Sequence, residues 1–323
     1  MTPADLSLTV LHAVRRAVDE GALRVDVPAR VKVERPRGGG VGDYASSVAL
    51  GLARPAGRSA LDVAAILKER LRECPGIRAV DITGPGFLNF SLDGDSDGRL
   101  VREVLDAGGR YGYSDALSAT RVRLLPATEV RAALVTETVL RLLRAQGADA
   151  AVGPEGERMA VLAAPADFSL QALGDDAGRW ALLRPAAHDH VLAGPPLLVQ
   201  HERNPLFRVR YAHARARRLL RNAEQLGFSA AYEERVDAGP LVALLGDHPA
   251  VLLSAARLRA PDRVARHLEA VADALLAFQH TVLPLGDEKP SAAHRSRLAL
   301  AEAAGAVLAG GLSLLGISAP DQI

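Results

Sequence analysis

A single predicted helix holds the side chains best suited to binding an anion or a nucleobase. Seven arginines and no carboxylate lie within residues 203–221. At 3.6 residues per turn, one polar face comprises Tyr211, Arg215, Arg218 and Asn222. Guanidinium groups pair with phosphates, while tyrosine rings and guanidinium planes stack on unpaired bases. The pattern suits single-stranded nucleic acid as a ligand, but for a generic helix of this composition a solvated basic face is the favoured interpretation.

The same segment has an apolar stripe that a helix bundle would bury. The stripe has the spacing of an amphipathic helix and consists of Ala212, Ala216, Leu219, Ala223 and Leu226. His213 projects away from the Tyr211 face, so we expect it to be a packing residue. The other histidines show no metal-ligand spacing, and we expect neither a metal nor a cofactor.

A predicted strand, residues 87–92, is the second candidate surface. Alternation places Phe87 and Asn89 on one face, and Leu88 and Phe90 on the other. An exposed ring can stack on a base, and an amide can hydrogen-bond to its edge. Two interpretations stay open: Phe87 is displayed beside the amide, or it belongs to the core.

Periodicity divides the chain into a mixed part and a helical part. Helical spacing occurs at residues 6–20, 43–52, 60–72 and 100–107, and strand patterns at 31–34, 79–83 and 87–92. A strand at 122–125, a helix at 129–145, a weakly patterned stretch and a helix at 175–183 follow. From residue 203 the pattern is nearly all helical, with breaks at Gly227, Gly239-Pro240, Gly246, Pro261 and residues 284–290. The run Gly38-Gly39-Gly40 lacks the spacing of a phosphate cradle and is interpreted as a loop.

The composition is that of a folded protein without a strong global charge. Because the net charge of the 323 residues is +1, any nucleic-acid site must be a local patch. The single cysteine, Cys74, excludes an internal disulfide. We identify neither an apolar signal core nor an apolar run of roughly 18–20 residues, the length that spans a bilayer. We therefore expect a cytoplasmic protein without a membrane partner.

Two sets of motifs resemble the two ends of an arginyl-tRNA synthetase. The first set is Val33-Glu34-Arg35-Pro36-Arg37, Gly42-Asp43-Tyr44-Ala45 and Gly84-Pro85-Gly86-Phe87-Leu88-Asn89-Phe90. The second is Asn204-Pro205-Leu206-Phe207-Arg208-Val209-Arg210-Tyr211-Ala212-His213-Ala214-Arg215, together with the closing stretch from Leu312 to Pro320.

This resemblance implies two tRNA-binding domains. Phe87 and Asn89 are the implied contacts to the tRNA elbow, and Tyr211 and Arg215 lie near the anticodon in the family's DALR-type domain. The chain departs from the family at two positions, where an aromatic residue and a glutamine are replaced by Arg208 and Arg210. Those replacements add positive charge, and they favour binding over specificity for arginine tRNA.

The catalytic signatures of the family are missing from this sequence. The segment 126–130 replaces the loop that carries His-x-Gly-His, a motif found nowhere in the chain. No lysine lies between Val122 and Val282, so a KMSKS loop cannot exist there. Amino-acid activation needs such groups to stabilise charge on the ATP phosphates. The segment from Gly174 to Leu183 resembles the family's Gly-Ala-Asp-Ala-Leu-Arg helix, with Gly178 in place of leucine.

These observations predict an α+β protein without catalytic residues. Residues 1–115 form a small α+β elbow-binding domain, 116–200 a degenerate strand-helix remnant of the catalytic domain, and 201–323 an all-α helix bundle of the DALR anticodon-binding type. The expected function is binding tRNA, with arginine tRNA as the candidate, in order to present, sequester or regulate it. Two alternatives stay open: a protein-interaction scaffold with decayed tRNA surfaces, and a non-catalytic subunit that joins a partner protein in a tRNA-dependent enzyme.

Overall fold

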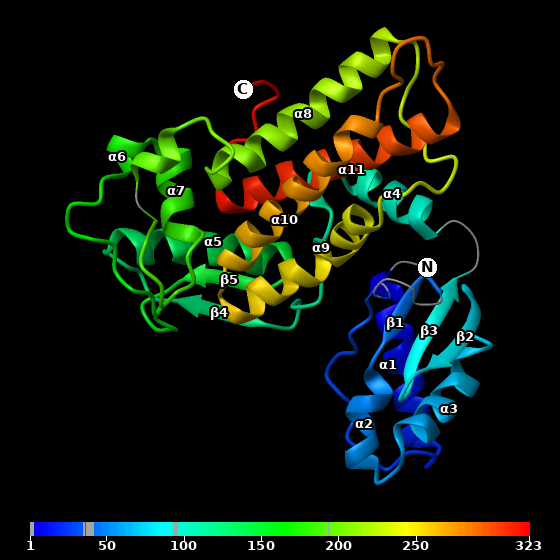
Figure 1. Ribbon diagram of the computed structural model, residues 1–323. Coiled ribbons are helices and arrows are strands. Elements are labelled where there is room, and N and C mark those ends of the chain that lie inside the picture. The colour runs from blue at the N-terminus through cyan, green and yellow to red at the C-terminus, as the bar shows by residue number, and fades with distance from the viewer. Residues whose placement is uncertain (1–2, 35, 37–41, 93–95, 193) are drawn as a thin grey trace. The chain divides into compact units, whose positions relative to one another are not determined.

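The computed structural model describes residues 3–34, 36, 42–92, 96–192 and 194–323. It divides into two compact units, Met1–Leu100 and Val101–Ile323, and confirms the α+β class, with mixed elements in the first unit and mostly helices in the second (Figure 1). Arg35, Arg37 and the glycine run 38–40 lie outside the described residues.

The first unit packs helices against one antiparallel sheet. Its elements are α1 (Pro3–Asp19), β1 (Tyr44–Ser46), α2 (Val48–Ala56), α3 (Ala60–Leu71), β2 (Ile77–Thr83) and β3 (Phe87–Leu92). The strand order is β1-β3-β2, so β3 is the central strand. Ser59 caps the N-terminus of α3, since its Oγ accepts a hydrogen bond from the Asp62 amide at 3.0 Å.

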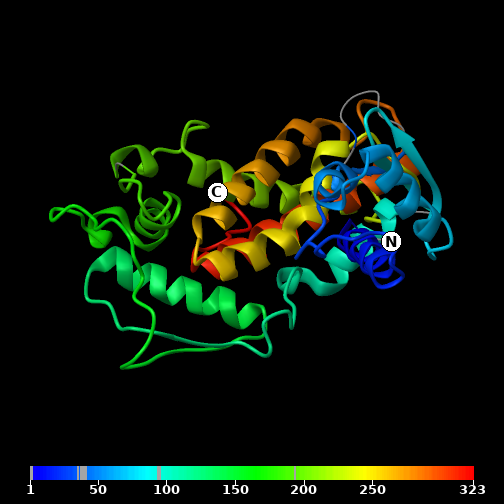
Figure 2. The same ribbon diagram turned by 90° about the horizontal axis from the view of Figure 1, so that it is seen from below.

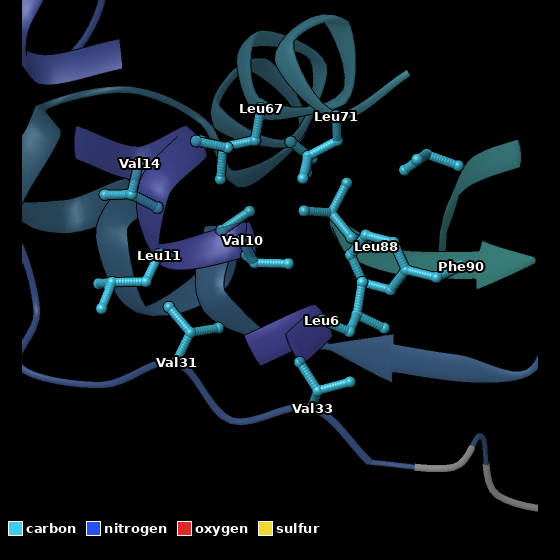
Figure 3. Close-up of a cluster of buried hydrophobic side chains, with 14 of the residues drawn as sticks. Leu6, Val10, Leu11, Val14, Val31, Val33, Leu67, Leu71, Leu88 and Phe90 are labelled. Atoms are coloured by element: carbon cyan, nitrogen blue, oxygen red, sulfur yellow. The ribbon is translucent and has the colours of Figure 1, made fainter. Parts of the chain in front are cut away.

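The apolar face of this sheet forms the core of the unit with α1 and α3. Leu88 and Phe90 on β3 are fully buried, as are Leu6 and Val10 on α1 and Leu67 on α3. Figure 3 shows these side chains converging from the strand and the two helices. The alternation that the sequence predicts for β3 therefore decides which of its faces meets the core.

Two local predictions in this unit are wrong at their boundaries. Residues 44–46 form the edge strand β1 instead of helix, because Tyr44 pairs with Phe90 and both side chains are buried. The predicted strand 31–34 contributes only a bridge, in which the Glu34 amide donates to Ala45 at 2.9 Å. Long-range pairing outweighs the helical period here.

The second unit begins with a short α/β region. Helix α4 (Ser96–Ala107) leads into it, and η1 (Gly108–Arg110), β4 (Arg121–Leu124), α5 (Val130–Ala145), β5 (Asp149–Val152), α6 (Leu170–Leu173) and α7 (Asp175–Leu183) follow. β4 and β5 pair in parallel. The predicted elements at 122–125, 129–145 and 175–183 are confirmed within a residue, and β5 and α6 add structure to the weakly patterned stretch.

The remainder of this unit is a helix bundle. It consists of η2 (Pro195–Leu198), α8 (Pro205–Gln225), α9 (Gly239–Leu258), α10 (Asp262–Phe278), η3 (Gln279–Thr281) and α11 (Ala292–Leu315). α11 packs against both α8 and α10, as the two views in Figures 1 and 2 agree. The predicted break at Gly246 is wrong, because Gly246 lies inside α9. The packing of α9 outweighs the roughly 1 kcal/mol that glycine costs in a helix.

Two helices of the described chain are apolar enough to cross a membrane by length and composition. In α9 the apolar window is 44% buried inside the unit, and in α11 it is 78% buried. The sequence prediction overlooked these runs. The burial of α11 among α8, α9 and α10 is the behaviour of a core helix.

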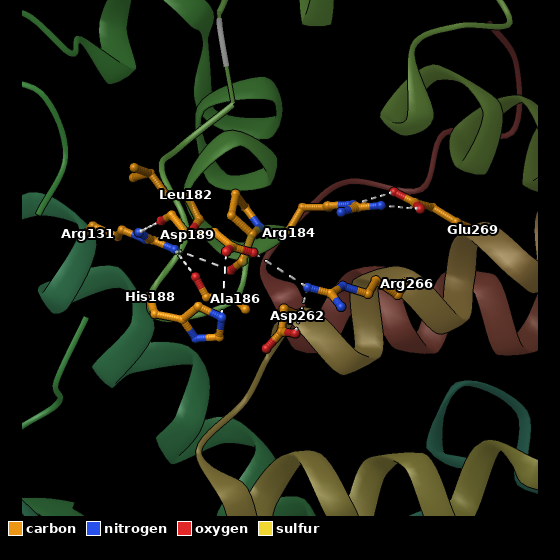
Figure 4. Close-up of polar contacts among 10 residues, drawn as sticks. Arg131, Leu182, Arg184, Ala186, His188, Asp189, Asp262, Arg266 and Glu269 are labelled. Atoms are coloured by element: carbon orange, nitrogen blue, oxygen red, sulfur yellow. Dashed lines mark hydrogen bonds and ion pairs between the residues drawn. The ribbon is translucent and has the colours of Figure 1, made fainter. Parts of the chain in front are cut away.

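A buried guanidinium joins α5 to the segments on either side of α7. Arg131 is 1% exposed, and all five of its N–H groups donate to backbone carbonyls, at 2.7–3.2 Å (Figure 4). The acceptors are Leu162, Leu182, Pro185, Ala186 and Asp189. Burial lowers the pKa of Arg131 from its usual range, while the nearest carboxylates act in the opposite direction. The complete set of acceptors offsets the cost of burying this charge.

An ion pair joins the end of α7 to the bundle. Arg184 donates to both carboxylate oxygens of Glu269 on α10, at 2.9 and 3.0 Å. Figure 4 shows this pair and the Arg131 contacts on neighbouring parts of the same segment. Together they fix residues 182–189 against α5 and α10.

Two histidines form a buried ring stack between α9 and α10. The ring centroids of His248 and His267 lie 5.2 Å apart, and Tyr111 stacks on His248 at 5.9 Å. Burial lowers the pKa of His248 to about 3, with a further contribution from His267, and lowers that of His267 to about 4. Both rings are therefore neutral at pH 7.

Replacing Arg131 with methionine should lower the free energy of unfolding of the second unit by about 3 kcal/mol or more, because five buried carbonyls lose their donors. Urea titration followed by the fluorescence of the buried Trp180 measures this loss. Arg144→Met is the matched control: Arg144 is exposed on the same helix and makes one hydrogen bond. Equal losses for the two variants would contradict the Arg131 assignment.

Acid should destabilise this unit through the histidine stack. Both pKa values are lower in the folded state than the usual 6.5, so the unfolded chain binds more protons as the pH falls from 6.5 to about 4. Each histidine then removes about 1.4 kcal/mol per pH unit. His248→Phe with His267→Phe should flatten this dependence in urea titrations at pH 4.5–6.5, whereas Leu252→Val should lower stability equally at every pH. An unchanged slope in the double variant would contradict the prediction.

Candidate nucleic-acid interface

Helix α8 carries the predicted binding face, and its motif residues define where it begins. The Asn204 side chain accepts from the Phe207 amide at 3.2 Å and donates to the carbonyls of Leu197 and Val199. Pro205 occupies the first helical turn, where its missing N–H costs nothing. The cap thereby fixes the start of the helix against η2.

The two predicted faces of α8 differ in their burial. Ala212, Ala216, Leu219 and Ala223 are buried, which confirms most of the apolar stripe, while Leu226 is 52% exposed beyond the last helical turn. The polar face comprises Tyr211 and Arg218, which are exposed, and Arg215 and Asn222, which are half-buried.

An aromatic pair gives the polar face a flat apolar platform. Phe207 and Tyr211, one turn apart, stack with centroids 5.7 Å apart and an interplanar angle of 19°. Tyr211 remains 39% exposed, and a ring held in this way can stack on an unpaired base. Phe207 is not among the site residues predicted from the sequence, although its spacing of four residues from Tyr211 is a usable signal.

Arg215 is positioned from a different helical segment. Its Nε donates to Gln279 Oε1 in η3, so one side of the guanidinium is fixed beside the platform. No local sequence pattern links these positions, which lie 64 residues apart. The arrangement presents a held guanidinium next to an exposed ring.

The two additional arginines are paired with carboxylates. Arg208 Nε lies 3.0 Å from Asp273 Oδ1 on α10. Arg210 lies 3.5 Å from Asp176 Oδ2 on α7 and donates to Ser318 Oγ at 3.2 Å. The charge that the sequence analysis counted as added is thus locally compensated.

His213 is a packing residue, as predicted. It is 5% exposed and its Nδ1 lies 3.0 Å from the Pro320 carbonyl oxygen. Burial lowers its pKa, and the hydrogen bond to Pro320 acts in the opposite direction. The lowered pKa favours the neutral form of His213.

A cleft of about 430 Å³ opens beside the start of α8. Its lining includes Phe207 and Arg210 from α8, Asp176 from α7, Leu198 from η2 and Ile323. Because Phe207 lines the cleft and also stacks on Tyr211, a concave surface adjoins the platform.

The candidate elbow residues of the first unit have unequal exposure. Phe87 is 39% exposed, whereas Asn89 is 4% exposed and donates to Thr83 Oγ1 at 2.7 Å. Both lie on the face opposite the core, but Asn89 is flanked by Ala45 on β1 and Asp81 on β2. The ring is displayed, and the amide supports the strand beside it. Their contact with RNA stays a prediction.

The loop between β4 and α5 carries a carboxylate at its end. Glu129 accepts from the amides of Arg131, Ala132 and Ala164 at 2.7–3.1 Å. Burial acts to raise the pKa of Glu129, but the hydrogen bonds from the backbone amides act to lower it, and the net shift of the pKa is downward. A helix N-terminus is otherwise a ready anion site, and here its donors are satisfied by a negative charge.

The residues after β5 return to β4 and its end. The Glu157 amide donates to Arg123 and the Leu125 amide to Glu157, both at 2.9 Å. The chain then passes Leu162, whose amide donates to Ala187 at 2.7 Å.

Among the described residues, no group of three or more His, Cys, Asp or Glu side chains could hold a metal ion.

Comparisons with known proteins connect both units to one family. A model of the arginyl tRNA synthetase N-terminal domain matches residues 8–92, and one of the DALR anticodon-binding domain matches residues 209–323. The chain is 28% identical to an arginine–tRNA ligase of Frankia alni over 555 aligned positions that cover all of both chains. A match of 43% identity to the ligase of Micrococcus luteus covers 50% of this chain and 33% of the relative.

Solved structures agree at the level of the fold. The arginyl-tRNA synthetase of Thermus thermophilus aligns with a TM-score of 0.73 at 13% identity, with 100% of each chain covered. That of Plasmodium falciparum gives 0.65 at 6% identity, with 99% of each chain covered. With 323 residues, the chain is shorter than full-length ligases of about 550 residues. It is an arginyl-tRNA synthetase-related protein that carries the N-terminal domain of that family and a DALR anticodon-binding domain.

Proposed function

We propose that this protein is a non-catalytic tRNA-binding module, a pseudoenzyme relative of arginyl-tRNA synthetase that acts in the cytoplasm. It holds the tRNA elbow through its first unit and the anticodon stem-loop through α8. The observation that carries the proposal is the Tyr211 face, where an exposed tyrosine ring stacked on Phe207 lies beside a positioned guanidinium.

The composition of this face suits RNA more than another protein. Unpaired loop bases stack on aromatic rings and guanidinium planes, and phosphates pair with arginine. Tyr211, Arg215 and Arg218 supply these groups within two turns of one helix. The domain names of the matched models add anticodon binding as the family role. Arginine tRNA is the proposed ligand, because the relatives are arginine–tRNA ligases.

The absence of catalysis is supported by the electrostatics of α5. Where the family's His-x-Gly-His loop would stabilise ATP phosphates, Glu129 places a carboxylate on the helix N-terminus. A carboxylate there repels phosphate. We accordingly assign residues 1–115 to elbow binding, 201–323 to anticodon binding, and 116–200 to a structural remnant between them.

Removing the Tyr211 face should weaken tRNA binding. Tyr211→Ala with Arg215→Ala is expected to reduce affinity for an arginine tRNA transcript by at least several-fold at about 50 mM salt, where counterion release favours binding. Each stacked base is worth about 1–3 kcal/mol. Fluorescence anisotropy of labelled tRNA measures the affinity.

The matched control is Tyr113→Ala with Arg257→Ala, which removes the same two exposed side-chain types outside α8. Phe87→Ala tests the elbow contact in the same assay, with the exposed Leu61→Ala on α3 as its control. Unchanged affinity in the α8 double variant rejects the site. Failure of the unaltered protein to bind tRNA at about 50 mM salt rejects the function and favours the scaffold alternative.

The protein should not activate arginine. Pyrophosphate exchange into ATP, assayed with arginine in the presence and absence of tRNA, is expected to stay at background, because the sequence has no His-x-Gly-His and no lysine between Val122 and Val282. A full-length arginine–tRNA ligase under identical conditions is the positive control. Arginine-dependent exchange by this chain would refute the non-catalytic assignment.

A further inference from the structure

The segment that follows α11 lies along α8 on the flank beside the Tyr211 face. Gly316 ends α11 in the left-handed conformation, at φ 73°, and residues 318–321 then contact α8 (Figure 1). Pro320 meets His213, and Asp321 meets Arg217 and Arg221. We name residues 316–323 the C-terminal segment.

The two ends of this segment are held with different strength. At the near end, the Ser318 amide donates to Asp176 Oδ1 at 2.9 Å and its hydroxyl donates to Oδ2. At the far end, Arg217 and Asp321 are 47% and 57% exposed in their side chains. Exposed ion pairs contribute about 0–1 kcal/mol, so a polyanion can displace Asp321 while Ser318 keeps its anchor.

Arg217 and Arg221 converge on Asp321 from successive turns of α8. Arg217 Nε donates to Asp321 Oδ1 at 3.2 Å, and Arg221 Nη2 donates to its backbone carbonyl at 3.3 Å. Two guanidiniums that converge on one acidic residue also suit a phosphate oxygen cluster. Glu302 also interacts with Arg217. Burial raises the pKa of Glu302, and Arg217 acts in the opposite direction.

The position of these arginines relative to Tyr211 fits one continuous ligand. At about 100° per residue, Arg217 and Arg221 lie roughly a quarter to a third of a turn around the helix from Tyr211. A strand whose bases stack on the platform can therefore place its backbone on this flank.

We propose that Arg217 and Arg221 form a phosphodiester-binding strip that Asp321 covers, so that the C-terminal segment competes with RNA for the flank of α8. This inference rests on the proposed function. It adds a backbone site outside the Tyr211 face and a built-in competitor that lowers the affinity for RNA.

The test compares Asp321→Asn with Asp287→Asn in tRNA binding over a series of salt concentrations. Both variants remove one exposed carboxylate, and Asp287 lies in the loop before α11. Asp321→Asn is expected to bind an arginine tRNA transcript about 3–10-fold more tightly at about 50 mM salt. Its log affinity should fall more steeply with log salt, by about 0.7–0.9 for each added phosphate contact. Asp287→Asn should match the unaltered protein in salt slope.

Adding Arg217→Ala and Arg221→Ala to Asp321→Asn should abolish the gain. If Asp321→Asn binds like the unaltered protein, or if the gain survives loss of both arginines, the strip is rejected. If the strip is rejected but Tyr211→Ala with Arg215→Ala binds tRNA more weakly than the unaltered protein, the proposed function stands without the strip. If none of the chains binds tRNA, both proposals fall together.

Discussion

The satisfied guanidinium of Arg131 is the constraint on which the second unit depends. A buried guanidinium that lost one acceptor would destabilise the fold, because the unpaired N–H has a desolvation cost. All five carbonyls must therefore stay in place at once. They belong to residue 162 and to residues 182–189. One side chain thereby orders the segments around α7, and α7 in turn presents Asp176 to α8 and to the C-terminal segment.

Charge placement separates what this chain can bind from what its relatives activate. One carboxylate lies at the N-terminus of α5, where Glu129 accepts hydrogen bonds from the free amides. Positive charge is concentrated on α8, but three of its six arginines pair with carboxylates: Arg208 with Asp273, Arg210 with Asp176 and Arg217 with Asp321. On the Tyr211 face Arg218 is exposed and Arg215 is half-buried, so the density of arginines in the sequence overstates the accessible charge.

The replacement of a family leucine by Gly178 has a packing reason. A Cβ at this position would lie 2.5 Å from Leu170 Cδ2. Leu170 belongs to α6, in the segment that leads into α7. The glycine and the segment before it are therefore complementary, because the leucine of α6 occupies the space that a side chain on α7 would need.

The sequence by itself determined the elements whose signals are local. Ser59 and Asn204 mark helix starts because their side chains cap nearby amides, and alternation places Phe87 and Asn89 on one face of β3 and Leu88 and Phe90 on the other. Tertiary structure alone decided that residues 44–46 pair as a strand, that the central position of β3 buries Asn89, and that Asp176, Asp273 and Asp321 take up arginines of α8. Periodicity reports the hydrogen bonding and solvent exposure of one segment, whereas the three carboxylates lie 34 to 104 residues along the chain from the arginines that they pair with.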